Sequence, residues 1–157
     1  MKGKSLKWLR TLHIISASIW LGATVCIGML TVICFFSLSE AKFLTIAPFI
    51  PELYRATVLP IAIFTILQGI IYGCFTKWGF FKYRWVLMKW ILVLLLIPCI
   101  GLGAIGHLFS VIDKVSTAGF AGGWADGGMV LLFIALQVVI MLIMVGISVF
   151  KPALKRA

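Results

Sequence analysis

Four apolar runs, each close to or above the length needed to cross a bilayer, constrain this chain more than any other feature. They lie at about Leu9–Phe36, Thr57–Phe75, Trp85–Phe109 and Met129–Phe150. A helix needs about 20 apolar residues to span the hydrocarbon core. In hydrocarbon each run must hydrogen-bond its own backbone, so each is predicted to be a helix. The expected fold class is all-α: an integral membrane four-helix transmembrane bundle, formed by a single domain over residues 1–157.

The composition excludes a water-soluble domain. Of the 157 residues, 63% are hydrophobic and 11% are charged. A soluble domain of this size exposes much of its chain, so this much apolar surface could not be hidden from water. The basic N-terminus resembles the start of a signal peptide, but the apolar run is too long and no A-x-A-like site follows it closely. The first run is therefore expected to stay as an anchor in the inner or plasma membrane.

The net charge of +10 is distributed unevenly. Three segments carry bases and no acid: Lys2, Lys4, Lys7 and Arg10; Lys77, Lys82 and Arg84; Lys151, Lys155 and Arg156. The two other connecting segments hold all four acids: Glu40, Glu52, Asp113 and Asp126. The positive-inside rule then predicts a multi-pass protein with both termini cytoplasmic. Nucleic-acid binding is not expected, because these bases flank spans and attract anionic lipid headgroups.

Every predicted span carries a polar or small-residue stripe on one helical face. In the first span the stripe follows three- and four-residue steps: His13, Ser16, Ala17, Trp20, Thr24 and Thr31. The second and fourth spans have shorter stripes: Thr65, Gln68 and Tyr72; Gln137, Met141, Met144 and Ser148. Lys89 and His107 in the third span are separated by about five helical turns and also share a face. These faces are predicted to point into the bundle.

Depth brings one histidine and the lysine together. The first and third spans both enter from the cytoplasm, so His13 and Lys89 are expected at a similar level. The fourth span exits there, which puts Met144 and Met141 at that level or about a turn deeper. His107 lies about 27 Å from Lys89 at roughly 1.5 Å rise per residue. His13 and His107 therefore cannot ligate one haem.

Each of these residues also has an interpretation without chemistry. His13 and His107 can be hydrogen-bonded interfacial residues, and Lys89 can snorkel to the headgroups. The methionines can be packing residues, and the cysteines are interpreted as small buried hydrophobes rather than copper ligands: Cys26, Cys34, Cys74 and Cys99. The G-x-G-x-x-G match at Gly101–Gly106 follows no strand, so we expect close approach of a helix or flat ligand there. The same holds for Gly69–Gly73.

Two short motifs carry a resemblance to a known family. "LHIISASIWLG" contains His13 with Trp20 seven residues later, and "WVLMK" contains Trp85 and Lys89 at the start of the third span. Together with the four-span layout, they resemble the HemJ-type protoporphyrinogen oxidases and the related CopD-like small membrane proteins. The resemblance implies bound haem b, with His13 and Lys89 as the functional, catalytic pair.

By this resemblance His13 would be the metal ligand of the haem. Lys89 would pair with a propionate or assist proton transfer to a porphyrinogen. Trp20 belongs to the same motif and is expected in the cofactor site. Met144 or Met141 is the candidate for a second axial ligand, on depth alone.

The first hypothesis is therefore a haem-b-binding membrane oxidoreductase or electron carrier, acting on a porphyrinogen or a quinone-like partner. Two others stay open: a copper-transport accessory protein, as CopD-like relatives suggest, and a structural or assembly subunit without catalysis. The sequence does not decide whether the protein is an enzyme, which substrate or redox partner it uses, or whether it forms a homo-oligomer.

Overall fold

The computed structural model describes residues 3–75 and 83–150, which are almost entirely helical. The elements in chain order are α1 (Gly3–Ser37), α2 (Glu40–Ile46), α3 (Phe49–Phe75), α4 (Arg84–Pro98), the π-helix η1 (Cys99–Gly106) and α5 (His107–Phe150). No β-strand occurs in this part of the chain. The prediction of an all-α fold is confirmed.

Three helical stretches within the described ranges are long and apolar enough to cross a membrane. They are Lys4–Ser37, Glu40–Phe75 and Arg84–Phe150. The surface of α1 agrees with lipid as the solvent, because Ile14, Ile15 and Ile19 are exposed. A water-soluble bundle would bury such residues. The three apolar helical stretches and the exposed isoleucines support the prediction of a helical membrane protein.

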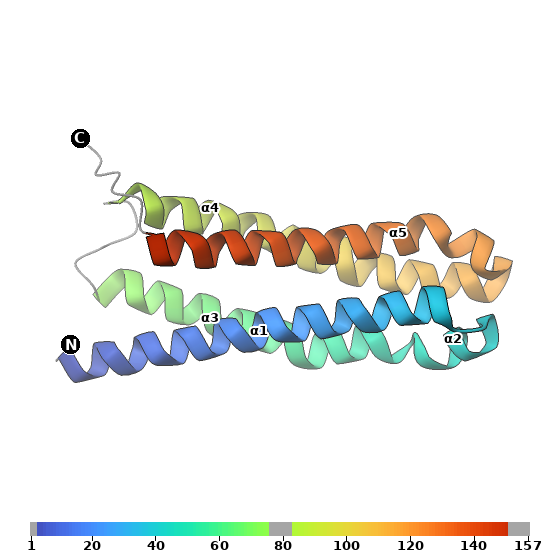
Figure 1. Ribbon diagram of the computed structural model, residues 1–157, viewed down its shortest axis with the longest axis horizontal. Coiled ribbons are helices and arrows are strands. Elements are labelled where there is room, and N and C mark those ends of the chain that lie inside the picture. The colour runs from blue at the N-terminus through green and yellow to red at the C-terminus, as the bar shows by residue number, and fades with distance from the viewer. Residues whose placement is uncertain (1–2, 76–82, 151–157) are drawn as a thin grey trace.

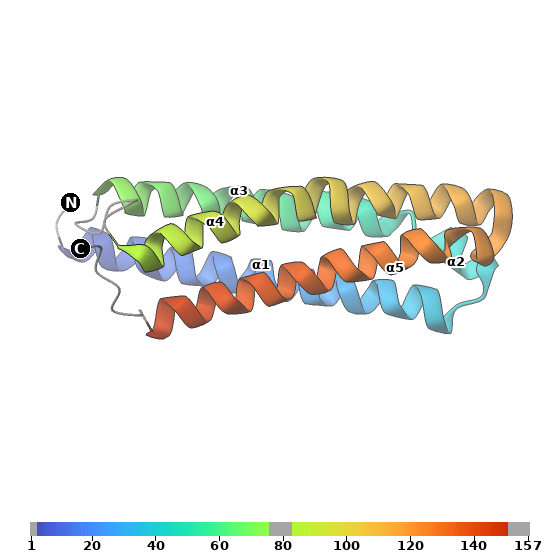
Figure 2. The ribbon, with the colours of Figure 1, turned by 90° about the horizontal axis from the view of Figure 1, so that it is seen from above.

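The chain reverses direction within α5, at Gly119. This residue has φ 68° and ψ −175°, a conformation that side chains with a Cβ rarely adopt. The helices on either side of it lie next to each other as a hairpin (Figures 1 and 2). Glu40 of α2 covers this turn, and its Oε2 accepts a hydrogen bond from the backbone N–H of Phe120 at 3.3 Å.

The bundle has two different ends. Figure 1 shows α1 with α3 in one layer, and α4, η1 and α5 in the other. The layers converge toward α2 and Gly119, which we call the hairpin end. They diverge toward the start of α1, the end of α3, the start of α4 and the end of α5, which we call the cavity end (Figures 1 and 2).

Helices extend beyond the predicted spans. α1 and α3 begin before Leu9 and Thr57, so the residues that precede both apolar runs are helical as well. Pro51 lies in the first turn of α3, where a helix needs no backbone N–H. Segment 110–128, which connects the third and fourth predicted spans and is rich in glycine, is helical except at Gly119.

The glycines of that segment allow close packing. A Cβ on Gly123 would lie 2.4 Å from Val115 Cγ2, and one on Gly127 would lie 2.6 Å from Phe35 Cε1. A side chain at either position would clash, so glycine lets the returning part of α5 approach its neighbours.

The predicted third span is not a regular α-helix. η1 begins directly after Pro98, which has no N–H and crowds the preceding turn. The count of five regular turns between Lys89 and His107 therefore does not apply. Both side chains still contact the returning part of α5, Lys89 through Ser148 and His107 through Phe133.

The polar stripe of the first span faces inward, as predicted. Its buried members are Ser16, Trp20, Thr24 and Thr31, and His13 is half-buried. The cysteine prediction is only half right: Cys34 and Cys99 are buried, but Cys26 and Cys74 are exposed. Cys26 and Cys74 lie on outward-facing helix surfaces, where a small apolar thiol is compatible with a lipid environment.

Candidate functional site

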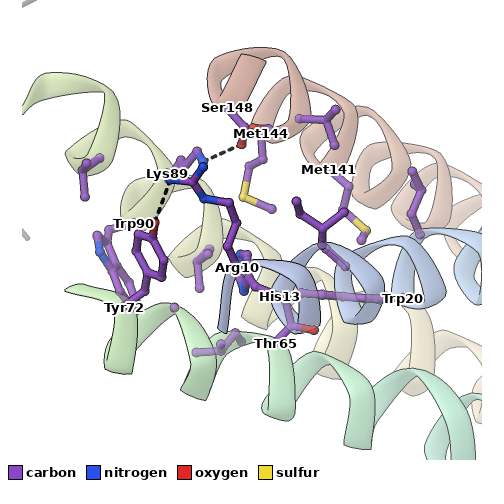
Figure 3. A pocket seen from close by; sticks show the side chains of 18 of the residues that line it. Arg10, His13, Trp20, Thr65, Tyr72, Lys89, Trp90, Met141, Met144 and Ser148 are labelled. Carbon is purple, nitrogen blue, oxygen red and sulfur yellow. Dashed lines mark hydrogen bonds between the residues drawn. The ribbon is translucent and has the colours of Figure 1, made fainter. Parts of the chain in front are cut away.

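A cavity of about 530 Å³ lies between the two layers at the cavity end. Its walls come from α1, α3, α4 and the end of α5, and Figure 3 shows how the side chains converge on it. Most of the lining is apolar, as in pockets that hold small organic molecules, and its volume falls within their usual range. The cavity lies where the two layers diverge.

All five residues predicted for the cofactor site line this cavity: His13, Trp20, Lys89, Met141 and Met144. They come from three helices, so the structure brings together what the sequence placed at one depth. His107 does not line it and lies toward the hairpin end. The prediction that His13 and His107 occupy separate places is confirmed.

His13 is packed against α3. A Cβ on Gly69 would lie 3.9 Å from its Cε1, so the small residue leaves room for the imidazole. Ser16, one turn later on α1, donates a hydrogen bond to Gln68 Oε1 at 2.8 Å, which ties the same two helices together. Lys89 lines the same cavity as His13, from α4.

Two buried nitrogens at this site have no hydrogen-bond partner among the described residues. They are Nδ1 of His13 and Nε1 of Trp20. Buried polar groups in folded proteins are nearly always paired, so each unpaired one needs an explanation. The two lie seven residues apart on one face of α1, and both residues line the cavity.

The polar part of the cavity contains two cationic side chains. Arg10 donates to Tyr72 Oη at 3.2 Å, and Lys89 donates to Ser148 Oγ at 2.5 Å. Lys89 Nζ also lies 5.3 Å from the centre of the Trp85 ring, a cation–π distance. Lys89 therefore turns toward the bundle and reaches across to α5.

Sequence reasoning missed Arg10 as a site residue. It was counted among the positive-inside bases, although it precedes His13 by about one helical turn. The i, i+3 spacing places Arg10 on the same side of α1 as His13, and this spacing could have identified Arg10 as a site residue. Its partner Tyr72 is 62 residues away in the sequence, so the contact depends on the packing of α1 against α3.

A second polar network lies deeper in the core. Tyr54 Oη donates to Gln137 Oε1, and Gln137 Nε2 donates to the carbonyl of Cys99 at 3.2 Å. Tyr54 and Gln137 are fully buried. The Gln137 side chain of α5 therefore connects Tyr54 of α3 with Cys99, the first residue of η1. The buried polar groups of Tyr54 and Gln137 are thus hydrogen-bonded.

The hairpin end holds a cluster of ionisable residues. Asp126 is only 8% exposed, and its carboxylate contacts His107 Nδ1 at 3.0 Å and Lys114 Nζ at 2.5 Å. His107 stacks on Phe133 with ring centres 5.9 Å apart. Within residues 3–75 and 83–150 no group of three or more His, Cys, Asp or Glu side chains could hold a metal ion.

No family model matches this sequence, and neither a curated protein nor a solved structure matches it. The resemblance to HemJ-type proteins therefore depends on the two short motifs and the predicted four-span layout. The functional proposal therefore depends on the side chains that line the cavity.

Proposed function

We propose that this chain is a multi-pass membrane protein that binds haem b in the cavity, as HemJ-like proteins do. The observation that carries the proposal is that His13, Lys89 and two thioethers line one mostly apolar cavity. An imidazole, a cation and a soft sulfur donor are the groups that haem iron and its propionates require. The residues present fit the cofactor.

The roles follow from the residue types. His13 would ligate iron, Lys89 would pair with a propionate, and Trp20 would pack against the ring system. Met141 or Met144 would offer a thioether sulfur as a further ligand to the iron. Nδ1 of His13 is covered by protein, so ligation requires a turn of the imidazole ring. Bound haem would supply one-electron chemistry for an oxidoreductase or electron carrier, with a porphyrinogen or quinone-like molecule as partner.

The test is the visible absorption spectrum of protein purified in mild detergent, before and after dithionite. We expect a strong Soret band that shifts on reduction, with haem near one per chain by pyridine haemochrome assay. Absence of the band, even after growth with excess haem precursor, would contradict haem binding. A structural or assembly subunit would then be the better hypothesis.

We further propose four crossings with both termini in the cytoplasm. The long apolar stretch Arg84–Phe150 is interrupted by the reversal at Gly119, which supports two crossings within it. Lys4, Lys7, Arg10 and Arg84 belong to the cavity end. The other bases of this argument lie outside the described residues: Lys2, Lys77, Lys82, Lys151, Lys155 and Arg156. The proposed location is the inner or plasma membrane.

C-terminal reporter fusions test this orientation. A fluorescent reporter that folds only in the cytoplasm should be active, and alkaline phosphatase at the same position should be inactive. A fusion at Gly119 should give the opposite result. An active phosphatase at the C-terminus would contradict the orientation.

A further inference from the structure

We propose that Arg10 is a ligand-binding residue, and that it forms with Lys89 a two-cation clamp for the anionic end of an amphipathic ligand. The anionic end is a carboxylate or a phosphate, and the apolar body occupies the rest of the cavity. The proposal deepens the haem hypothesis by assigning Arg10, but the clamp requires only the charge of the ligand and not its iron.

The two cations approach the cavity from different helices. Arg10 lies on α1 and Lys89 on α4, and Figure 3 shows both side chains directed into the same polar region. Neutral groups orient them: Tyr72 accepts from Arg10, while Ser148 accepts from Lys89. A hydroxyl can orient a cation without neutralising its charge.

No acidic side chain of the protein neutralises this pair. The chain has four, and all lie within the described residues toward the hairpin end: Glu40, Glu52, Asp113 and Asp126. None lines the cavity. Arg10 is exposed and Lys89 is half-buried. Two cations directed to one place repel each other, and an anion reduces that repulsion. Electrostatics therefore favour a ligand with negative charge at this end.

The clamp would also connect the two layers of the bundle. α1 and α4 are not among the helix pairs that pack closely, because the layers diverge at this end. A single anionic group bound by both cations would bridge them. Arginine suits this role because its planar fork can hold two oxygens at once.

The test uses metal-free protoporphyrin IX and its dimethyl ester, which share one ring system but differ in charge. Fluorescence titrations are done with protein in phosphatidylcholine nanodiscs. The wild type should bind the dicarboxylate about tenfold or more tighter than the diester, since a charge-assisted hydrogen bond contributes that much. Arg10→Gln should lose most of this preference, and Arg10→Lys should keep part of it.

Lys7→Gln is the matched control, because it removes one exposed positive charge of the same helix outside the cavity. It should retain the wild-type preference. Equal binding of acid and diester by the wild type, or an unchanged preference in Arg10→Gln, would overturn the clamp. Circular dichroism and thermal unfolding of Arg10→Gln establish that the variant is folded.

A second arm distinguishes a carboxylate ligand from a lipid phosphate. Phosphatidylglycerol is added to the nanodiscs, and protoporphyrin release is followed. Release from the wild type but not from Arg10→Gln would identify a lipid headgroup as an occupant and would support the clamp. Retention in both would favour the carboxylate. Because the probe has no iron, a failed Soret test leaves this result standing, and a failed clamp leaves iron ligation by His13 untouched.

Discussion

The two ends of the bundle treat ionisable side chains in opposite ways. At the hairpin end Asp126 contacts both His107 and Lys114, and Glu40 caps the turn at Gly119. At the cavity end, two cations, an imidazole and two thioethers line one mostly apolar cavity. Ionisable groups within a membrane protein are costly. The hairpin end offsets that cost with an internal carboxylate, whereas no acidic side chain lines the cavity at the other end.

Packing shows the same contrast. The rings of Phe43 and Phe120 lie 5.3 Å apart at the hairpin end, and Gly123 and Gly127 admit close contacts. At the cavity end the layers diverge around about 530 Å³ of space. The comparison teaches that a histidine or lysine in a span is not informative alone. Whether such a residue meets an internal counter-charge or lines a cavity separates a structural contact from a candidate site.

The largest effect on stability is expected for Asp126→Ala. The change leaves His107 and Lys114 without their shared carboxylate, and Lys114 is half exposed, so water compensates in part. We expect a loss of about 2 kcal/mol, or roughly 4–8 °C in Tm. Differential scanning fluorimetry in detergent measures it, with the exposed Asp113→Ala as control. Equal Tm values for both variants would show that the cluster does not stabilise the fold.

Gly119→Ala should have the second largest effect. A Cβ would have to adopt φ 68° and would lie 3.1 Å from Glu40 Oε2. We expect about 1–2 kcal/mol of destabilisation in the same assay. Gly128→Ala is the matched control, because no neighbouring atom lies within 4 Å of its Cβ position. That control should be neutral or slightly stabilising, and a larger loss there than at Gly119 would contradict the strained turn.

The smallest effect on stability is expected for Lys89→Met at the cavity end. The free energy of unfolding of the apoprotein should stay within about 1 kcal/mol of the wild-type value, or rise slightly, because a costly charge is removed from the bundle. The Tm should then change by no more than about 2–4 °C. Ligand retention should nevertheless weaken, and gel filtration followed by absorbance measures it. A Tm loss as large as that of Asp126→Ala would mean that Lys89 is structural, and the contrast between the ends would fail.

Much of the fold was accessible from the sequence because lipid restricts the choice to helices. The positions at which the helices begin and end were harder to predict from the sequence. Segment 110–128 has the composition of a loop, but it is helical, and its glycines allow close packing. Gly123 packs against Val115 and Gly127 against Phe35, and these contacts form only when the chain has folded. The π-helix η1 changes the helical period without a sequence pattern that reveals it, although Pro98 marks its start.

The candidate site was predictable where one helix carried the signal. The stripe that contains His13 and Trp20 turns inward as its spacing indicates. Arg10 was missed because a base near a span end has an ordinary topological explanation. Its contact with Tyr72, like that of Lys89 with Ser148, arises only when different helices meet.

The Soret absorbance per folded chain, compared between His13→Ala and His107→Ala, tests the central claim most directly. Both variants remove an imidazole from the bundle, one at each end. We predict that His13→Ala loses the band, because only apolar contacts and the propionate pairing remain. His107→Ala should keep a band of wild-type intensity and position despite its lower stability, since Asp126 has lost a partner. A band that survives in His13→Ala and disappears in folded His107→Ala would contradict the account.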